Sequence, residues 1–321
     1  MAEKIQKRNS KRKRKNRIRF VFLLLCGSYI LCSILHLQPF AHGNVLFKKL
    51  FQTNYTAKYE IGTPRVIDES DISDCLYTLS KTYPEFKSIY ENQDAYPKKL
   101  LSALCNNPEM IDFVKEYPKH KGKNTSNATL HSSDWNADGY PLLFQWDTRW
   151  GYHSFGDNNI GLSGCAPTCL SMVIIGLTKD KSATPEKVAD YITNNGYYLK
   201  GTGTSWSVMS DGVADFHITG KEISLDETVI ANILEKKQPI ICSLRPGDFT
   251  TTGHFIVLTA YKDGKLQVHD PNSPIVVQNS GITVSCKVKL KIYGRFLNSN
   301  FELAHIECQS GSYGQKAGRC S

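Results

Sequence analysis

The residues with the clearest chemical potential are a cysteine, a histidine and an aspartate. Cys165 follows a glycine-rich turn, residues 161–164, and stands just before Pro167 and a run of apolar residues. Proline is accepted in the first turn of a helix but not in its interior, so the pattern predicts a buried helix that begins near Cys165. Unpaired N–H groups and the dipole at a helix start favour a thiolate, the form of cysteine that attacks carbonyl carbons.

His254 and Asp270 are the partners that such a nucleophile needs. His254 opens an apolar strand, and Asp270 ends the next strand of the same predicted hairpin. Residues at the open end of a hairpin lie close together, so we expect Asp270 to accept a hydrogen bond from His254. A histidine that is oriented by a carboxylate and faces a helix-terminal cysteine makes an activated nucleophile.

Structural interpretations compete with these roles. Cys165 could be a buried thiol, and His254 could be a core histidine on an apolar strand. Cys169, one turn into the predicted helix, is expected in the core. His269 competes for the same partners, but strand alternation should point it away from Asp270. Cysteine and histidine spacings typical of zinc sites are missing from the sequence, so we expect no metal and no other cofactor.

Four motifs in register resemble the peptidase family C-39-like domain, whose members are relatives of bacteriocin-leader peptidases with a papain-like fold. The motifs are Gln145-Trp146-Asp147-x-x-Trp150-Gly151, Gly164-Cys165-x-Pro167-Thr168, Gly253-His254 and Asp270-Pro271-Asn272, within residues 140–274. The resemblance implies that Cys165 is the nucleophile, His254 the general base and acid, and Asp270 the orienting residue. It also implies that Gln145 donates to the oxyanion beside the Cys165 N–H.

The order of predicted elements indicates an α+β domain over residues 140–274. Helices are expected at residues 184–194 and 205–216, and a capping box formed by Ser224 and Glu227 predicts another. Strands follow at residues 239–244, 254–261 and 266–269. Helices first and strands afterwards favour α+β over alternating units, and the resemblance implies a papain-like cysteine peptidase fold.

Positive charge is concentrated at the start of the chain. The 321 residues carry a formal net charge of +9, and residues 1–19 form a basic tail with ten Lys or Arg and one Glu. The remainder is neutral, so a nucleic-acid partner is not expected. Residues 20–38 contain no charged side chain and are long enough to span a membrane, with the basic tail in the cytoplasm and the rest outside. A cleaved signal peptide and a buried soluble helix are the alternatives.

Three segments separate this predicted span from the α+β domain. Residues 39–70 are predicted to be a juxtamembrane linker, residues 71–118 a series of short helices, and residues 119–139 an exposed linker. The helices carry no evident chemistry and are interpreted as a spacer or a substrate-facing subdomain. Cys75 and Cys105 could form a disulfide in an oxidising compartment or remain two reduced buried thiols.

The sequence changes character after Pro274. Residues 275–296 are mixed in pattern, and residues 309–321 resemble disordered filler. Codons for residues 287–296, read in a shifted frame, permit the aromatic-rich ending that the resemblance implies. We therefore hypothesise a frameshift near Pro274 and expect residues 297–321 to lie outside the fold.

These observations together predict a membrane-anchored, extracytoplasmic cysteine peptidase or amidase. Its partners would be a peptide or protein substrate and, through residues 20–38, the membrane. Two alternatives stay open: an acyl or amide transferase, in which an amine replaces water, and a non-catalytic module that binds peptides or cell-wall material. The substrate, its cleavage site and the oligomeric state are not specified by the sequence.

Overall fold

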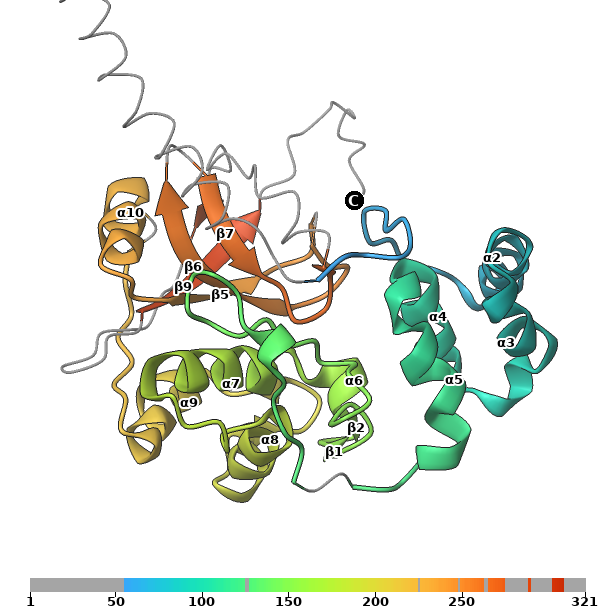
Figure 1. The fold of residues 1–321 in the computed structure, drawn as a ribbon, viewed down its shortest axis with the longest axis horizontal. Coiled ribbons are helices and arrows are strands. Elements are labelled where there is room, and N and C mark those ends of the chain that lie inside the picture. Colours follow the sequence, from blue (N-terminus) through green and yellow to red (C-terminus); the bar gives the residue numbers. More distant parts are fainter. Residues whose placement is uncertain are drawn as a thin grey trace, which may run out of the picture. The chain divides into compact units, whose positions relative to one another are not determined.

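The computed structural model describes residues 55–124, 127–224, 226–247, 249–262 and 265–274, and the backbone of residues 288–289 and 302–308 (Figure 1). The first α-helices are α2 (Glu69–Thr82), α3 (Lys87–Glu91), α4 (Lys98–Asn106) and α5 (Ile111–His120), connected by short 3-10 turns. We call residues 69–120 the helical segment. Its apolar residues recur at helical spacing and are buried, for example Leu100, Leu101 and Leu104 on α4.

A disulfide between Cys75 and Cys105 joins α2 to α4. Of the two alternatives that the sequence left open, the structure therefore shows the bridged one. The two cysteines are 30 residues apart, and closing a loop of that length stabilises a fold by about 3–4 kcal/mol through the unfolded state.

The helical segment shares a core with the start of the following domain. Phe113 of α5 stacks on Tyr152, with ring centroids 4.7 Å apart, and Phe144 stacks on Trp146 in the same apolar cluster. A segment that buries its apolar face against residues 142–152 is not a free-standing spacer.

The helices of the second part are α6 (Ile160–Ser163), α7 (Cys165–Thr178), α8 (Pro185–Asn194), α9 (Ser207–Ser210) and α10 (Glu227–Glu235). Helix α7 is buried from Ala166 to Gly176, as its almost wholly apolar sequence predicts. It packs against α8 and against the sheet strand β6 (His254–Lys262), which also contacts α10. Two short ribbons complete this part, β1 (Ser154–Phe155) with β2 (Asn158–Asn159) and β3 (Tyr198–Leu199) with β4 (Gly203–Thr204).

The main sheet of the described residues has the order β7-β6-β5-β9-β8. Its other strands are β5 (Ile240–Leu244), β7 (Lys265–His269), β8 (Val288–Lys289) and β9 (Glu302–Cys308). Strand β6 runs antiparallel to both β5 and β7, whereas β9 lies parallel to β5 (Figure 1). Helices that precede a largely antiparallel sheet are consistent with the predicted α+β class.

Two local predictions were wrong in detail. Residues 205–216 form not one helix but α9 and a 3-10 turn, Gly212–Phe216. A Cβ at Gly212 would lie 2.9 Å from Tyr197 and from Val208, so this position accepts only glycine without rearrangement. Helix α10 is capped not by a Ser224–Glu227 box but by Asp226, whose carboxylate accepts from the Val229 N–H at 3.0 Å.

The tail prediction was also wrong for one stretch. Residues 302–308 pair with β5, with Ile240 opposite Glu302 and Leu244 opposite Ile306. The open edge of β5 offers unpaired backbone groups, so an extended segment gains hydrogen bonds by adding there. The rest of residues 297–321 lies outside the described residues, and the frameshift hypothesis stays a prediction that resequencing the gene would test.

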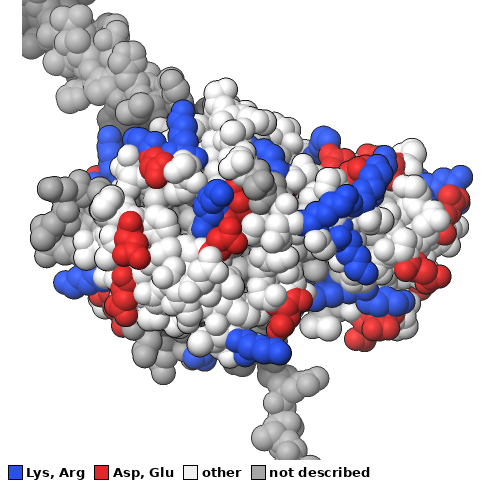
Figure 2. All heavy atoms as spheres, turned by 90° about the horizontal axis from the view of Figure 1, so that it is seen from below, with Lys and Arg blue, Asp and Glu red and all other residues white. Residues whose placement is uncertain are grey.

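The membrane prediction falls outside the part of the chain that the structure describes. Within that part, no helix has both the length and the apolar character needed to cross a bilayer. The predicted span, residues 20–38, lies outside it. On the face shown in Figure 2, basic and acidic side chains lie interspersed.

Candidate active site

Cys165 is the first residue of α7, and its half-buried thiol is positioned by a tight turn. Gly164 allows this turn, because a Cβ there would lie 2.5 Å from the carbonyl oxygen of Ile160. Gly161 lies against Phe113 of the helical segment, where a Cβ would come within 2.3 Å of the ring. As the first helical residue, Cys165 keeps an N–H that the helix itself does not pair.

His254 and Asp270 lie beside one another at the open end of the β6–β7 hairpin. The imidazole Nε2 is 2.8 Å from Oδ1 of Asp270, and the two side chains are 7% and 1% exposed. The Cys165 thiol is near enough to the same imidazole to contribute to raising its pKa. Because Nε2 is occupied by the carboxylate, Nδ1 is the ring nitrogen left for the sulfur. The structure thus pairs the histidine and aspartate that the sequence singled out, and Cys165 is among the groups that act on the ring.

The electrostatic surroundings of His254 favour its charged form. Burial by itself would lower the pKa of the imidazole, but the charge and hydrogen bond of Asp270, together with the nearby Cys165, raise it to about 10. His254 is therefore an imidazolium at neutral pH. A positive charge beside a cysteine favours the thiolate, and an imidazolium can protonate a leaving amine.

Gln145 connects the nucleophile turn to the aspartate loop. Its side-chain Nε2 donates to the Gly161 carbonyl at 3.0 Å, and its backbone N–H donates to the Pro271 carbonyl at 2.7 Å. The residue is buried, and a primary amide carries a second N–H in addition to the one used here. Gln145 therefore contacts the turn that precedes Cys165, and its role as an oxyanion donor stays a prediction.

Asn272 and Trp146 belong to the recognised motifs, but sequence reasoning assigned them no role. The Asn272 N–H donates to Asp270 Oδ1 at 2.7 Å, and the Asn272 carbonyl accepts from the Trp146 indole at 2.9 Å. Together they fix the turn that presents the carboxylate. The signal that could have revealed this role was the position of both residues beside predicted site residues.

The competing residues lie elsewhere. Cys169 is fully buried. Burial raises the pKa of its thiol, and the nearby Cys165 raises it further. His269 points to the opposite face of β7 from Asp270, as alternation predicted. Its Nε2 is 2.7 Å from Asp138, and its Nδ1 is 3.1 Å from the Pro141 carbonyl, so it belongs to a second buried His–Asp pair.

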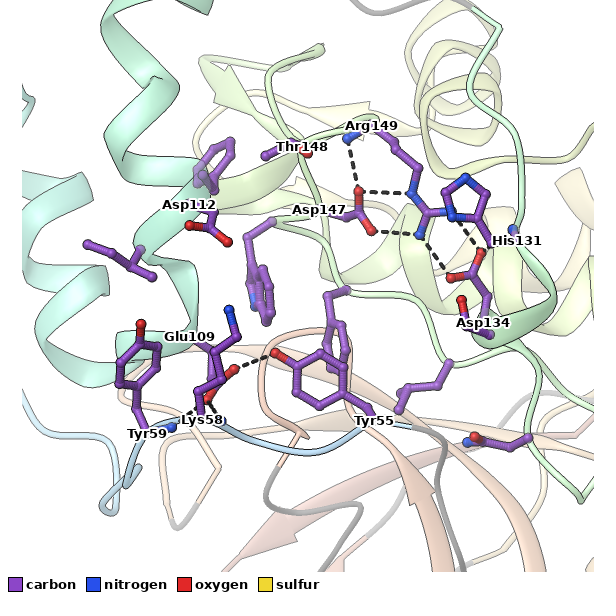
Figure 3. A pocket seen from close by; sticks show the side chains of 17 residues that line it. Tyr55, Lys58, Tyr59, Glu109, Asp112, His131, Asp134, Asp147, Thr148 and Arg149 are labelled. Atoms are coloured by element: carbon purple, nitrogen blue, oxygen red, sulfur yellow. Dashed lines mark hydrogen bonds and ion pairs between the residues drawn. The ribbon is translucent and has the colours of Figure 1, made fainter. Parts of the chain in front are cut away.

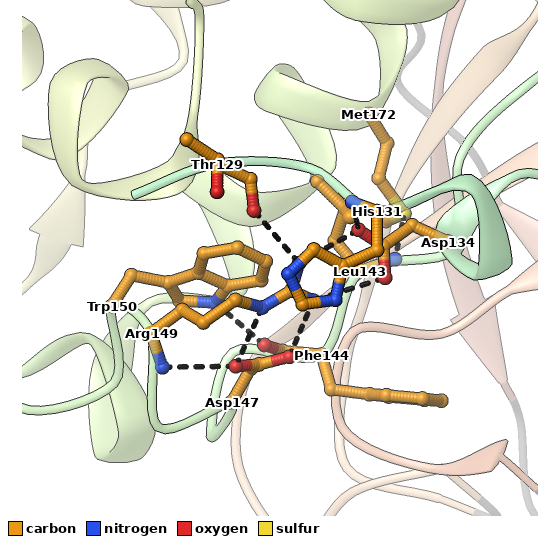
Figure 4. Close-up of polar contacts among 9 residues, drawn as sticks. All are labelled: Thr129, His131, Asp134, Leu143, Phe144, Asp147, Arg149, Trp150 and Met172. Carbon is orange, nitrogen blue, oxygen red and sulfur yellow. Dashed lines mark hydrogen bonds and ion pairs between the residues drawn. The ribbon is translucent and has the colours of Figure 1, made fainter. Parts of the chain in front are cut away.

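A cavity of about 480 Å³ in the described residues does not include Cys165, His254 or Asp270. It is lined by residues within 55–59, 109–113 and 131–149 (Figure 3). Arg149 bridges Asp147 at 2.6 Å and Asp134 at 2.7 Å, so two carboxylates on this wall share one positive charge (Figure 4). Another cavity, of about 300 Å³, is bordered by Asp270 and therefore adjoins the candidate site.

Comparison with known proteins agrees with the geometry. Residues 137–296 match the model of the Peptidase_C39 like family. This stretch is similar to the C-39-like peptidase family, and we call residues 137–296 the C-39-like domain. The match continues past Pro274, where the sequence pattern had placed the end of the domain. Neither the curated proteins nor the solved structures gave a match. The C-39-like domain therefore holds Cys165, His254, Asp270 and Gln145, whereas the helical segment precedes it.

Proposed function

We propose that the C-39-like domain is a cysteine hydrolase that cleaves peptide or amide bonds. Cys165 is the nucleophile, His254 the acid and base, and Asp270 the residue that orients the ring. The observation that carries this proposal is an imidazole that lies 2.8 Å from a carboxylate, with a thiol at a helix start among the groups that raise its pKa. The family of residues 137–296 supports the same class of chemistry.

In the first half of the reaction, the Cys165 sulfur attacks the carbonyl carbon of the scissile bond. The carbonyl π electrons move to oxygen, where the Cys165 N–H and Gln145 Nε2 donate hydrogen bonds to the oxyanion. The C–N bond then breaks as His254 gives its proton to the leaving nitrogen. An amine departs, and a thioester remains on Cys165.

In the second half, water attacks the thioester. His254, now neutral, accepts a proton from this water, and Asp270 stabilises the imidazolium that forms. The C–S bond breaks, the carboxylic acid leaves, and the sulfur and the ring return to their starting charges. Asp270 Oδ1 faces Nε2 throughout, which keeps Nδ1 directed at the reacting atoms.

Selective alkylation tests this function on the full chain. Iodoacetamide at pH 7 should label Cys165, whereas the buried Cys169 and Cys242 should stay unlabelled. With the label located by peptide mapping, His254→Ala should slow labelling at Cys165 about tenfold or more, and Cys165→Ala should remove the label from that peptide. Equal labelling of Cys165, Cys169 and Cys242, the free thiols of the described residues, or no effect of His254→Ala, would contradict an activated nucleophile.

Turnover then separates hydrolysis from the alternatives. A peptide library incubated with the full chain should yield new carboxyl termini that disappear in Cys165→Ala. Products that incorporate an added amine would indicate an acyl transferase, and binding without cleavage would indicate a peptide-binding module. Either outcome would reject the hydrolase.

We also propose that the domain faces outward from a membrane, held by residues 20–38. The charge pattern of residues 1–38 supports this orientation, and the Cys75–Cys105 disulfide is of the kind that persists in oxidising compartments. Protease added to intact cells should release the C-39-like domain. Protection of residues 55–274 until the cells are lysed would overturn the orientation.

A further inference from the structure

One residue of the helical segment reaches the loop that carries Asp270. Asn107 follows α4 directly and is 2% exposed. Its side-chain Nδ2 donates to the Asn272 carbonyl at 2.5 Å, across 165 positions of sequence. Asn107 precedes the C-39-like domain and belongs to none of the motifs.

A chain of hydrogen bonds connects Asn107 to the imidazole of His254. The Asn272 carbonyl is held by Asn107 and by Trp146, and the Asn272 N–H donates to Asp270 Oδ1 at 2.7 Å. The same Oδ1 lies 2.8 Å from His254 Nε2. Moving the Asn272 peptide would therefore change the position of the carboxylate oxygen that orients the ring.

We propose that Asn107 is a positioning residue of the active site, which fixes the Asn272 peptide and thereby holds Asp270 against His254. This inference rests on the proposed cysteine hydrolase function. It makes the helical segment part of the catalytic unit, because that segment supplies a buried donor to the loop behind the triad.

The surroundings of Asn107 hold its amide in one orientation. Its Oδ1 accepts from the Glu109 N–H at 3.2 Å, which leaves Nδ2 directed at Asn272. Cys105, two residues earlier, is tied to α2 by the disulfide. Phe113 of the same segment packs so closely on Gly161 that no side chain fits between them. The segment is thus attached both to the nucleophile turn and to the aspartate loop.

The Asn107 side chain accepts a hydrogen bond from the Glu109 N–H and donates one to the Asn272 carbonyl, and substitutions can separate these two contacts. Asn107→Ala removes both the cap on Glu109 and the donor to Asn272. Asn107→Asp keeps an oxygen for the Glu109 N–H but places a second oxygen against the Asn272 carbonyl. Asn106→Ala is the matched control, because the bonds of Asn106 go to the backbone of Arg65 and Ser102 and not to the loop that carries Asp270.

The experiment measures the ring and the thiol separately in the full chain. The pKa of His254 is followed by NMR, and the titratable groups that act on it are Asp270 and Cys165. The thiol is followed by iodoacetamide alkylation at pH 7 and by kcat and KM for p-nitrophenyl acetate. Thermal unfolding of each variant records any general loss of stability.

We expect both Asn107 variants to lower the pKa of His254 by about one unit or more, since the Asp270 contact loosens. Alkylation and kcat should fall about tenfold, with KM within about twofold, in line with the loss of one buried hydrogen bond. Asn106→Ala should match wild type in these readouts. Trp146→Phe, which removes the other donor to Asn272, should act in the same direction as Asn107→Ala.

Two results would overturn the inference. Wild-type behaviour of Asn107→Asp beside a defective Asn107→Ala would mean that the residue only caps a turn. An unchanged His254 pKa in both variants would mean that Asp270 is held without Asn107. Failure of the proposed function would show separately: in wild type, Cys165 would not be alkylated selectively and the ester would not be hydrolysed. The NMR comparison of the variants does not depend on turnover, so the two failures can be told apart.

Discussion

Replacing Asp270 with asparagine should uncouple the cysteine from its activating histidine. The substitution keeps the size of the side chain but removes the charge that lies 2.8 Å from His254 Nε2. The pKa of His254 should then fall from about 10 to its ordinary value of 6.5 or below, since the burial that lowers it remains. At about 1.4 kcal/mol per pKa unit, this fall corresponds to about 5 kcal/mol of differential stabilisation of the imidazolium.

Because the pKa of His254 is raised in the folded protein, its contribution to stability depends on pH. A histidine whose folded pKa exceeds its unfolded value contributes stability in full below pH 6.5 and loses it as the pH rises through about 10. Wild type and Asp270→Asn should therefore differ most in unfolding free energy near pH 6 and converge above pH 10.

Alkylation of Cys165 by iodoacetamide is the matching functional assay. Wild type should react at pH 6.5, because the imidazolium persists there beside the thiol. Asp270→Asn should react at least tenfold more slowly at pH 6.5 and recover at alkaline pH. Loss of turnover should reach 10²-fold or more, as expected when a triad carboxylate is replaced.

The second buried His–Asp pair is the control for this experiment. Asp138→Asn breaks the contact to His269, which lies on the opposite face of β7 from Asp270. It should lower stability but leave the pH profile of alkylation unchanged. An identical profile in wild type and Asp270→Asn would refute the argument that Asp270 sets the charge of His254.

Three further predictions concern stability. Cys169→Ala should lower the unfolding free energy by about 1 kcal/mol or more, because the thiol is fully buried, while Cys165 alkylation stays at the wild-type rate; a loss of labelling would reassign the nucleophile. Burial would raise the pKa of Asp138, but His269 and Thr259 hold it below the ordinary value of 3.8. The Asp138–His269 pair therefore stabilises the fold above pH 3.8, and this contribution is lost as the pH falls further. Asp138→Asn should accordingly cost about 3–5 kcal/mol in urea unfolding at pH 7, and a neutral effect would contradict a stabilising pair. The double variant Cys75→Ser, Cys105→Ser should lose about 3–4 kcal/mol, and reduced wild type should lose the same amount.

Much of the candidate site could be predicted because its signals are local. A glycine turn before Cys165, a proline two residues later and an apolar run define the start of a buried helix within a dozen residues. The hairpin joins strands that are consecutive in sequence, so His254 and Asp270 could be paired without knowing the rest of the fold. Alternation along β7 likewise separated His269 from Asp270.

Other features could not be predicted from local patterns. The choice between a disulfide and two thiols at Cys75 and Cys105 depends on how α2 packs on α4. The cap of α10 fell to Asp226 because several polar residues precede the helix and only the backbone geometry selects one. The addition of residues 302–308 to β5 depends on which sheet edge is open.

The sequence by itself determined the kind of chemistry, since a thiol at a helix start and a His–Asp hairpin are patterns of neighbouring residues. Only the tertiary structure decided what surrounds that chemistry. Asn107 is an ordinary helix-ending residue in the sequence, and it becomes a donor to Asn272 only when the helical segment packs on the C-39-like domain. Hydrogen bonds between residues distant in sequence depend on how whole elements are placed relative to one another. Many weak apolar contacts together determine that placement, and it cannot be predicted from the spacing of neighbouring residues.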